Sequence, residues 1–288
     1  MPYLYLISSV FFVASSSILG AFYNKKNVGK KSATELYNAL LLSSVAVFWL
    51  VSFLLDGTFD WAVVPYSILF AASYTICNVG LINALKTGSV ALTSLMLQLS
   101  LIGTTIWGFF FWDTKFTPLV AIGLILVAVA LWLCLYTGKK EKGAFSWKWL
   151  FFTMMAFLGN VGCTIVQKTQ QMDFNAQYGN FLMMVAIAIS AIVCIVMYLR
   201  SDKIDFSQTV RTSWYFPVSA GVCNALLNLF VIFLATSSLS PSLIYPVLSI
   251  GGLMLTTTCS AFIFKEKMHW WQWLGIGVGI VAVGILSL

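Results

Sequence analysis

The side chains that could do chemistry in this chain are mostly amides and hydroxyls set inside long apolar runs. Tyr74 and Asn78 are four residues apart, as are Asn224 and Asn228, so each pair shares one helix face. Inside a membrane, such groups either bind a polar solute or bond to a neighbouring helix. Their recurrence on several helices predicts a polar cavity enclosed by an apolar shell.

Twelve residues form the predicted substrate-binding set. Each carries an amide, a hydroxyl or a phenol, and most recur at corresponding places in the two halves of the chain. For any single member the alternative is a packing role, in which the side chain bonds to a neighbouring helix and contributes about 0.6 to 2 kcal/mol. The set is Asn38, Tyr74, Asn78, Ser94, Gln98, Asn160, Gln167, Asn180, Asn224, Asn228, Tyr245 and Ser249.

Formal charge is scarce in the interior. All nine carboxylates fall in loops or at the ends of apolar runs, so no acid is expected mid-membrane to carry a proton. Glu35 is the nearest substitute, and we expect it to be a solvated carboxylate at a helix end. Lys25, Lys86 and Lys168 are the bases nearest the interior, and each is expected to extend to the surface. The predicted cargo is therefore a neutral, zwitterionic or monocationic metabolite, about the size of an amino acid.

Catalytic and metal-binding patterns are missing from the sequence. The six cysteines lie in apolar segments without the spacing of a metal site or a disulfide framework, so we expect them to be reduced. No paired intramembrane carboxylates and no Ser/His or His/Asp arrangement occur, so we predict no catalytic residue, no metal and no cofactor. The 16 Lys and Arg residues sit in short loops and form no continuous basic face, so nucleic acid is not an expected partner.

Composition requires membrane helices to position these groups. Of 288 residues, 60% are hydrophobic and only 9% charged, which excludes a soluble globular protein. The sequence predicts an all-α integral membrane protein with ten transmembrane helices. The expected spans are 3–23, 33–55, 62–85, 88–111, 117–137, 147–168, 176–199, 212–235, 240–264 and 269–287.

The two halves of the chain resemble each other. An offset of 151 pairs Ala84 with Ala235, and an offset of about 143 pairs Lys25 with Lys168. Five spans per copy is an odd number, so the second copy crosses the membrane in the opposite sense, as two inverted five-helix repeats. The expected boundaries are 1–140 for the first repeat and 145–288 for the second.

Loop charge predicts the orientation. Of the 16 Lys and Arg residues, 14 fall in odd-numbered connections and two in even-numbered ones. Because positively charged loops stay in the cytoplasm, the odd connections are predicted to be cytoplasmic and both termini outside. We expect this orientation in a bacterial plasma membrane.

Taken together, these features resemble the drug/metabolite transporter superfamily, specifically a chain of two EamA-like domains. The resemblance covers nearly the whole chain and includes a lysine near the end of each copy's first helix, Lys25 and Lys168. The clearest local match is Phe264-Lys265-Glu266-Lys267 followed by Leu274-Gly275; the first copy has Trp112-Asp113-Thr114-Lys115 at that turn. Members of this group are thought to keep both termini in the cytoplasm, whereas the charge bias here predicts the reverse.

The resemblance implies a secondary transporter that works by alternating access. A channel is the alternative, and a membrane-embedded enzyme is a weaker one. The predicted partners are a small-molecule metabolite and the lipid bilayer. We expect a monomer, although the small-residue spacing from Gly275 to Gly279 leaves open a dimer formed through the last helix.

Overall fold

The computed structural model describes residues 1–27, 32–87, 90–112, 115–135, 146–201, 211–264 and 269–286. The described residues are almost entirely α-helical and contain no strand. The long helices are α1 (Pro2–Lys26), α2 (Ala33–Asp56), α3 (Val64–Thr87), α4 (Val90–Phe111), α5 (Pro118–Leu135), α6 (Trp147–Asp173), α7 (Gly179–Arg200), α9 (Tyr215–Ala235), α10 (Pro241–Phe264) and α11 (Trp270–Leu286), and the short 3₁₀ helix η1 spans Trp61–Val63.

Seven of these helices are long and apolar enough to cross a membrane, judged on the described residues by length and composition. Three further apolar stretches are shorter, namely Met96–Phe111, Pro118–Cys134 and Trp270–Leu286. The expected all-helical class is confirmed.

The outer surface of the bundle is strongly apolar. Leu54, Leu55 and Phe110 are exposed by 68%, 84% and 77%. A surface this apolar would be poorly hydrated in water, and the protein would aggregate. An apolar exterior around long apolar helices is consistent with an integral membrane protein.

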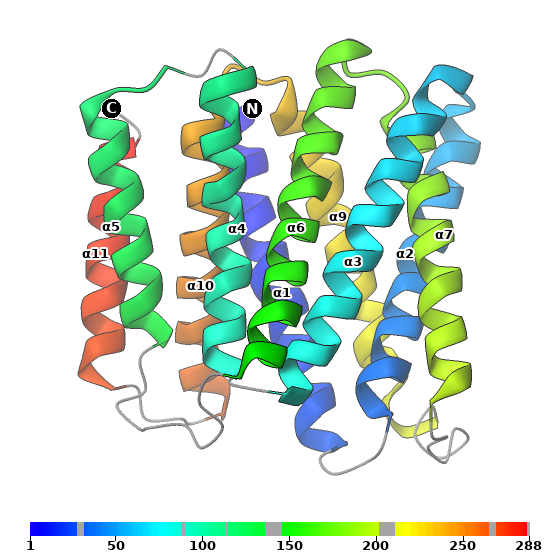
Figure 1. Ribbon diagram of the computed structural model, residues 1–288, viewed down its shortest axis with the longest axis horizontal. Helices are drawn as coiled ribbons and strands as arrows, with labels where there is room; N and C mark the ends of the chain where they lie inside the picture. Colours follow the sequence, from blue (N-terminus) through cyan, green and yellow to red (C-terminus); the bar gives the residue numbers. More distant parts are fainter. Residues whose placement is uncertain are drawn as a thin grey trace.

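The helices stand roughly parallel and form two edges with a group of helices between them. The pair α5 and α11 forms one edge, and the pair α2 and α7 forms the other (Figure 1). α1, α3, α4, α6, α9 and α10 lie between these edges. Met1 and the last turn of α11 lie at the same end of the bundle, which we call the terminal end (Figure 1).

The helix interfaces follow a regular exchange. Exchanging α1, α2, α3, α4 and α5 with α6, α7, α9, α10 and α11, in that order, turns each main interface into another main interface or leaves it unchanged. Under this exchange, the interface α3–α6 becomes α9–α1, and α4–α6 becomes α10–α1. The interface α3–α7 likewise becomes α9–α2, while α2–α7, α4–α10 and α5–α11 map onto themselves. All of these interfaces are among the most extensive in the bundle.

The backbones of α3 and α6 approach each other closely at two glycines. A Cβ atom on Gly159 would lie 2.5 Å from the Cys77 nitrogen and 2.6 Å from the Ser73 carbonyl oxygen. A Cβ on Gly80 would lie 2.6 Å from the Ala156 nitrogen. Only glycine allows the two helices to approach this closely, and this contact fixes the position of α6.

The glycines of α11 pack within the chain. A Cβ on Gly275 would meet the Cys134 nitrogen of α5 at 2.7 Å, and one on Gly279 would meet the Met254 sulfur of α10 at the same distance. The small-residue face of α11 therefore contacts α5 and α10 of its own chain. A dimer formed through this helix stays a prediction.

Candidate functional site

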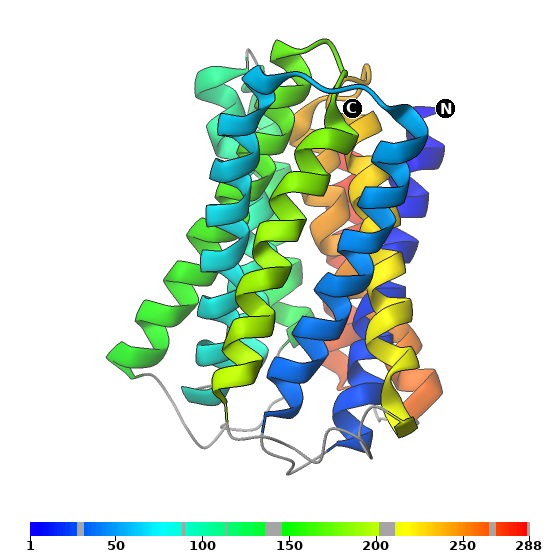
Figure 2. The ribbon, with the colours of Figure 1, turned by 90° about the vertical axis from the view of Figure 1, so that its right-hand side faces the viewer.

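A cavity of about 540 Å³ lies at the terminal end of the bundle, between the end of α2, the start of α7 and the last turns of α9. Figure 2 shows these three helices side by side. Asp56, Thr58, Ala176 and Gln177 lie on its wall and are exposed, so the cavity can be reached from outside the bundle.

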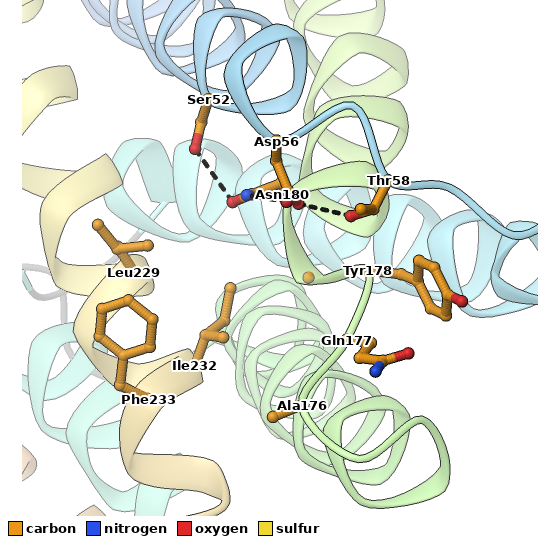
Figure 3. A pocket seen from close by; sticks show the side chains of 11 residues that line it. Ser52, Asp56, Thr58, Ala176, Gln177, Tyr178, Asn180, Leu229, Ile232 and Phe233 are labelled. Carbon is orange, nitrogen blue, oxygen red and sulfur yellow. Dashed lines mark hydrogen bonds between the residues drawn. The ribbon is translucent and has the colours of Figure 1, made fainter.

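Polar side chains line one wall of the cavity and are bonded to one another. Asn180 donates from Nδ2 to Asp56 Oδ2 at 3.1 Å, and Ser52 donates to Asn180 Oδ1 at 3.0 Å. Thr58 donates from its hydroxyl to Asp56 Oδ2 at 2.7 Å (Figure 3). The network holds the carboxylate of Asp56 in a fixed position, where it can attract a positively charged group.

Local backbone conformation places these residues. Gly57 ends α2 with a φ of 64°, which turns the chain directly after Asp56. Asn175, Ala176 and Tyr178 have φ values of 50°, 64° and 61°, so the connection into α7 is bent at three residues that are not glycine. L-residues adopt this conformation at an energetic cost, and such residues occur often at binding sites.

The opposite wall of the cavity is apolar. Leu229, Ile232 and Phe233 of α9 line it, facing the polar network across the cavity (Figure 3). A cavity with one polar and one apolar wall suits a small solute that has a charged or polar end and an apolar part. Among the described residues, no cluster of three or more His, Cys, Asp or Glu side chains could hold a metal ion.

Of the twelve predicted site residues, Asn180 lines this cavity. A second polar region lies between α4 and α6, where Asn160 donates to Ser100 Oγ at 2.6 Å and the hydroxyls of Thr104 and Thr164 are 2.5 Å apart. This ladder joins two helices, as expected for the packing role. It also gives the interior a polar stripe, of which the predicted set contained only Asn160.

Three of the predicted amides bond within their own helix. Asn38 donates to the Thr34 carbonyl at 3.0 Å, Asn78 to that of Tyr74 at 2.8 Å, and Asn228 to that of Asn224 at 2.9 Å. All three side chains, and that of Asn224, are partly exposed. Each amide can exchange this local bond for one to a solute at small cost.

The remaining predicted residues lie in several environments. Ser249 of α10 is fully buried and donates to the Gln98 carbonyl of α4 at 2.8 Å, which is a contact between helices. Gln167 is 3% exposed, and its Nε2 is 3.9 Å from the Met183 sulfur of α7.

The two predicted tyrosines pack against other aromatic rings. The ring of Tyr74 stacks on Phe70 at 5.8 Å, and the buried ring of Tyr245 lies 6.4 Å from Trp112. The side chain of Ser94 lies outside the described residues.

The expectation for Lys168 was wrong. Its side chain is only 6% exposed and does not extend to the surface. The ammonium donates to the Ala235 carbonyl at 2.7 Å and lies 5.4 Å from the centre of the Trp112 ring. The predicted span ended at 168 because polar residues follow, whereas α6 continues to Asp173 and buries Gln170 and Gln171 completely.

The carboxylates are distributed largely as expected. Asp56 and Asp173 are the last residues of α2 and α6, and Asp60 caps η1. Glu35 also lies at a helix end, in the first turn of α2, but it is 7% exposed, so the expectation of a solvated side chain was wrong. Asp113, Glu141, Asp202, Asp205 and Glu266 lie outside the described residues. All six cysteines are free, as predicted.

Comparison with known proteins establishes the fold and goes no further. No protein-family model matches the chain, and no curated protein sequence matches it. A solved structure described as "Crystal structure of protein" superposes with a TM-score of 0.76 over 99% of this chain and 96% of that one, at 11% sequence identity. The helical arrangement of this chain therefore exists in a known structure.

Proposed function

We propose that this chain is a secondary transporter of the drug/metabolite transporter superfamily. It moves a small neutral, zwitterionic or monocationic metabolite across a membrane by alternating access. The observation that carries the proposal is a half-polar cavity at one end of a bundle whose main interfaces occur in exchangeable pairs. Two equivalent halves can rock against each other and expose one site to either side in turn.

The exchange of helix interfaces supports two inverted five-helix, EamA-like repeats, 1–140 and 145–288. An odd number of spans per repeat inverts the second repeat in the membrane relative to the first. The interfaces at the centre of the bundle then join a helix of one repeat to a helix of the other. The interfaces α3–α6 and α1–α9 are such a pair. The shortest of the long helices described above, α11, has 17 residues and is about 26 Å long at 1.5 Å per residue, which is close to the thickness of a bilayer core.

The cavity has the size and chemistry for such a cargo. Its volume of about 540 Å³ falls within the range of small-molecule sites. Asp56, held by Asn180 and Thr58, draws a positive group to the entrance, and Phe233 covers an apolar part. The polar ladder between α4 and α6 offers hydrogen bonds along the interior for the next step of transport.

Uptake into proteoliposomes tests this function. The reconstituted protein is expected to take up at least one member of a panel of amino acids and small amines, with a rate that saturates as the concentration rises. Asn180→Ala removes the link between α2 and α7 and should lower kcat/KM about tenfold, the effect of about 1.4 kcal/mol. Asn83→Ala is the matched control, because the Asn83 amide donates to the Val79 carbonyl of its own helix.

The orientation proposed from loop charge needs its own experiment. Alkaline phosphatase fused after Leu288 is active only outside the cytoplasm, so the charge bias predicts an active fusion in a bacterial host. An inactive phosphatase fusion together with a fluorescent C-terminal green fluorescent protein fusion would place the termini in the cytoplasm and contradict that orientation.

A further inference from the structure

Two buried polar groups of α6 lie beside the cavity and take no part in its hydrogen-bond network. Lys168 is 6% exposed and Gln171 is fully buried. They are three residues apart in the helix, so they lie on neighbouring positions of one face with Cβ atoms about 5 to 6 Å apart. The Lys168 ammonium is a charged hydrogen-bond donor, and the Gln171 side-chain oxygen is a hydrogen-bond acceptor.

Lys168 is a buried ammonium with no counterion in the part of the chain that the structure describes. Its contacts are the Ala235 carbonyl at 2.7 Å and the Trp112 ring at 5.4 Å, and no carboxylate of the described residues lies within ion-pair distance. Burial of an ammonium that no acid neutralises is costly, and ionisable residues inside membrane proteins are mostly retained for function.

Gln171 offers an acceptor without a donor. Its Nε2 donates to Gln170 Oε1, while its own Oε1 is buried and receives no hydrogen bond from any residue that the structure describes. Buried polar atoms without a partner are rare in native proteins and point to a missing ligand, water or ion.

Both groups adjoin the cavity. A Cβ on Gly179, which lines the cavity, would lie 3.0 Å from Gln171 Nε2 and 3.3 Å from a methyl group of Ile232. Ala235, which binds Lys168, is three residues beyond Ile232 on α9. Gln171 therefore lies directly behind the cavity wall, and the Lys168 ammonium lies at the same end of the bundle, against the last residue of α9 and one helical turn beyond the cavity-lining Ile232.

We infer that Lys168 and Gln171 form a two-point site for a zwitterionic amino acid. The Lys168 ammonium binds the carboxylate of the cargo, and Gln171 Oε1 accepts a hydrogen bond from its α-ammonium group. The spacing of the two residues suits the adjacent charges of an α-amino acid. The inference rests on the proposed carrier function and narrows its cargo, since amines without a carboxylate and neutral solutes satisfy only one of the two groups.

A purely structural role explains less of the geometry. An ammonium at the C-terminus of α9 interacts favourably with the helix dipole, which accounts for the contact with Ala235. That role leaves the acceptor of Gln171 unexplained and gives no selectivity for a carboxylate over an amide. A preference for a solute with a carboxylate over its amide therefore distinguishes a binding role of Lys168 from a purely structural one.

The experiment measures binding and transport with matched solutes. Each of the twenty standard amino acids is tested for an increase in the thermal midpoint of the purified protein. For the best one, the corresponding amine, amide and N-acetyl derivative are then compared in binding and in proteoliposome uptake. The variants are Lys168→Gln, Lys168→Arg and Gln171→Met, with Lys26→Gln as control.

Lys26 is a matched control because its ammonium makes similar contacts but is exposed. It donates to the Thr212 carbonyl and lies 5.5 Å from the ring of Tyr215. The unchanged protein and the Lys26→Gln variant should bind the amino acid at least about tenfold more tightly than each of the three derivatives.

Each α6 variant has its own expected loss. Lys168→Gln should bind the amino acid and its amide equally, and Gln171→Met should bind the amino acid and its N-acetyl derivative equally. Lys168→Arg keeps the charge and should keep at least a threefold preference for the carboxylate, which guards against a folding defect in the glutamine variant.

Three results would overturn the site: no thermal shift with any amino acid, equal binding of the derivatives to the unchanged protein, or full carboxylate preference in Lys168→Gln. Uptake of an amine in any of these cases leaves the carrier function in place. Binding that depends on Lys168 without any uptake supports the site and removes the carrier function.

Discussion

The two ends of α9 each receive a lysine, and the main difference between the two lysines is their burial. Lys26 donates to the Thr212 carbonyl at 2.5 Å just before α9 begins, and Lys168 donates to the Ala235 carbonyl at 2.7 Å where it ends. Both ammonium groups lie beside aromatic rings. Lys26 is exposed, whereas Lys168 is 6% exposed.

The comparison shows that the same contacts have different costs in different surroundings. An exposed ammonium keeps most of its hydration, so its hydrogen bond needs no further explanation. A buried ammonium loses hydration that one carbonyl and one ring do not replace. The terminal end of the bundle, with its cavity and its buried lysine, is therefore where function is expected, and the opposite end of α9 serves structure.

The largest expected effect comes from separating α6 from α3, because that contact fixes the position of Lys168. Gly159→Leu would force atoms into backbone that lies 2.5 to 2.6 Å from the first added carbon. We expect a loss of at least about 3 kcal/mol of stability, seen as a collapse of the monodisperse peak in size-exclusion chromatography. Gly277→Leu is the control, because nothing lies within 4 Å of its Cβ position, and equal behaviour of the two variants would disprove this packing.

The next effect sharpens the comparison of the two lysines. Lys168→Met removes a buried charge and keeps the apolar stem, so we expect it to raise the free energy of unfolding by about 1 to 2 kcal/mol while transport is lost. Lys26→Met should change stability by less than about 0.5 kcal/mol. Chemical denaturation in detergent measures both. A destabilised Lys168→Met would mean that the lysine serves mainly to cap α9.

The smallest effect concerns the polar ladder between α4 and α6. A double-mutant cycle of Asn160→Ala and Ser100→Ala should give a coupling of about 0.6 to 1.7 kcal/mol, because the two side chains are joined across helices at 2.6 Å. The same cycle with Asn78→Ala and Ser100→Ala should give no coupling, since Asn78 bonds to the Tyr74 carbonyl of its own helix. Equal couplings would show that the ladder is not a specific contact.

The sequence predicted the helices well, because long apolar runs with charged breaks have few alternative structures. Its largest error was the end of the sixth helix. Gln170 and Gln171 are polar and suggested a loop, but α6 continues to Asp173 and buries both. The surface location predicted for Lys168 failed for the same reason, since one more turn of helix moves its side chain into the bundle.

The site could be predicted only in part, because spacing along a helix does not say which neighbour covers a face. Asn180 was predicted and lines the cavity, whereas Asp56 was assigned to a loop at a helix end and its place at the entrance went unnoticed. Asn38 and Asn78 are asparagines like Asn180 and were predicted for the same reason, yet both bond within their own helices. Contacts between distant segments, such as the 3.0 Å bond from Ser52 to Asn180, follow from helix packing and cannot be read from local sequence.

The most direct test of the carrier mechanism is counterflow. Proteoliposomes loaded with a high concentration of the transported solute are diluted into a trace of the same solute in labelled form. Alternating access predicts that the label accumulates transiently above its equilibrium level, because outward movement of unlabelled cargo returns the site to the outside. A label that enters only to equilibrium, at a rate linear in concentration and unaffected by internal cargo, would show a channel and contradict the mechanism.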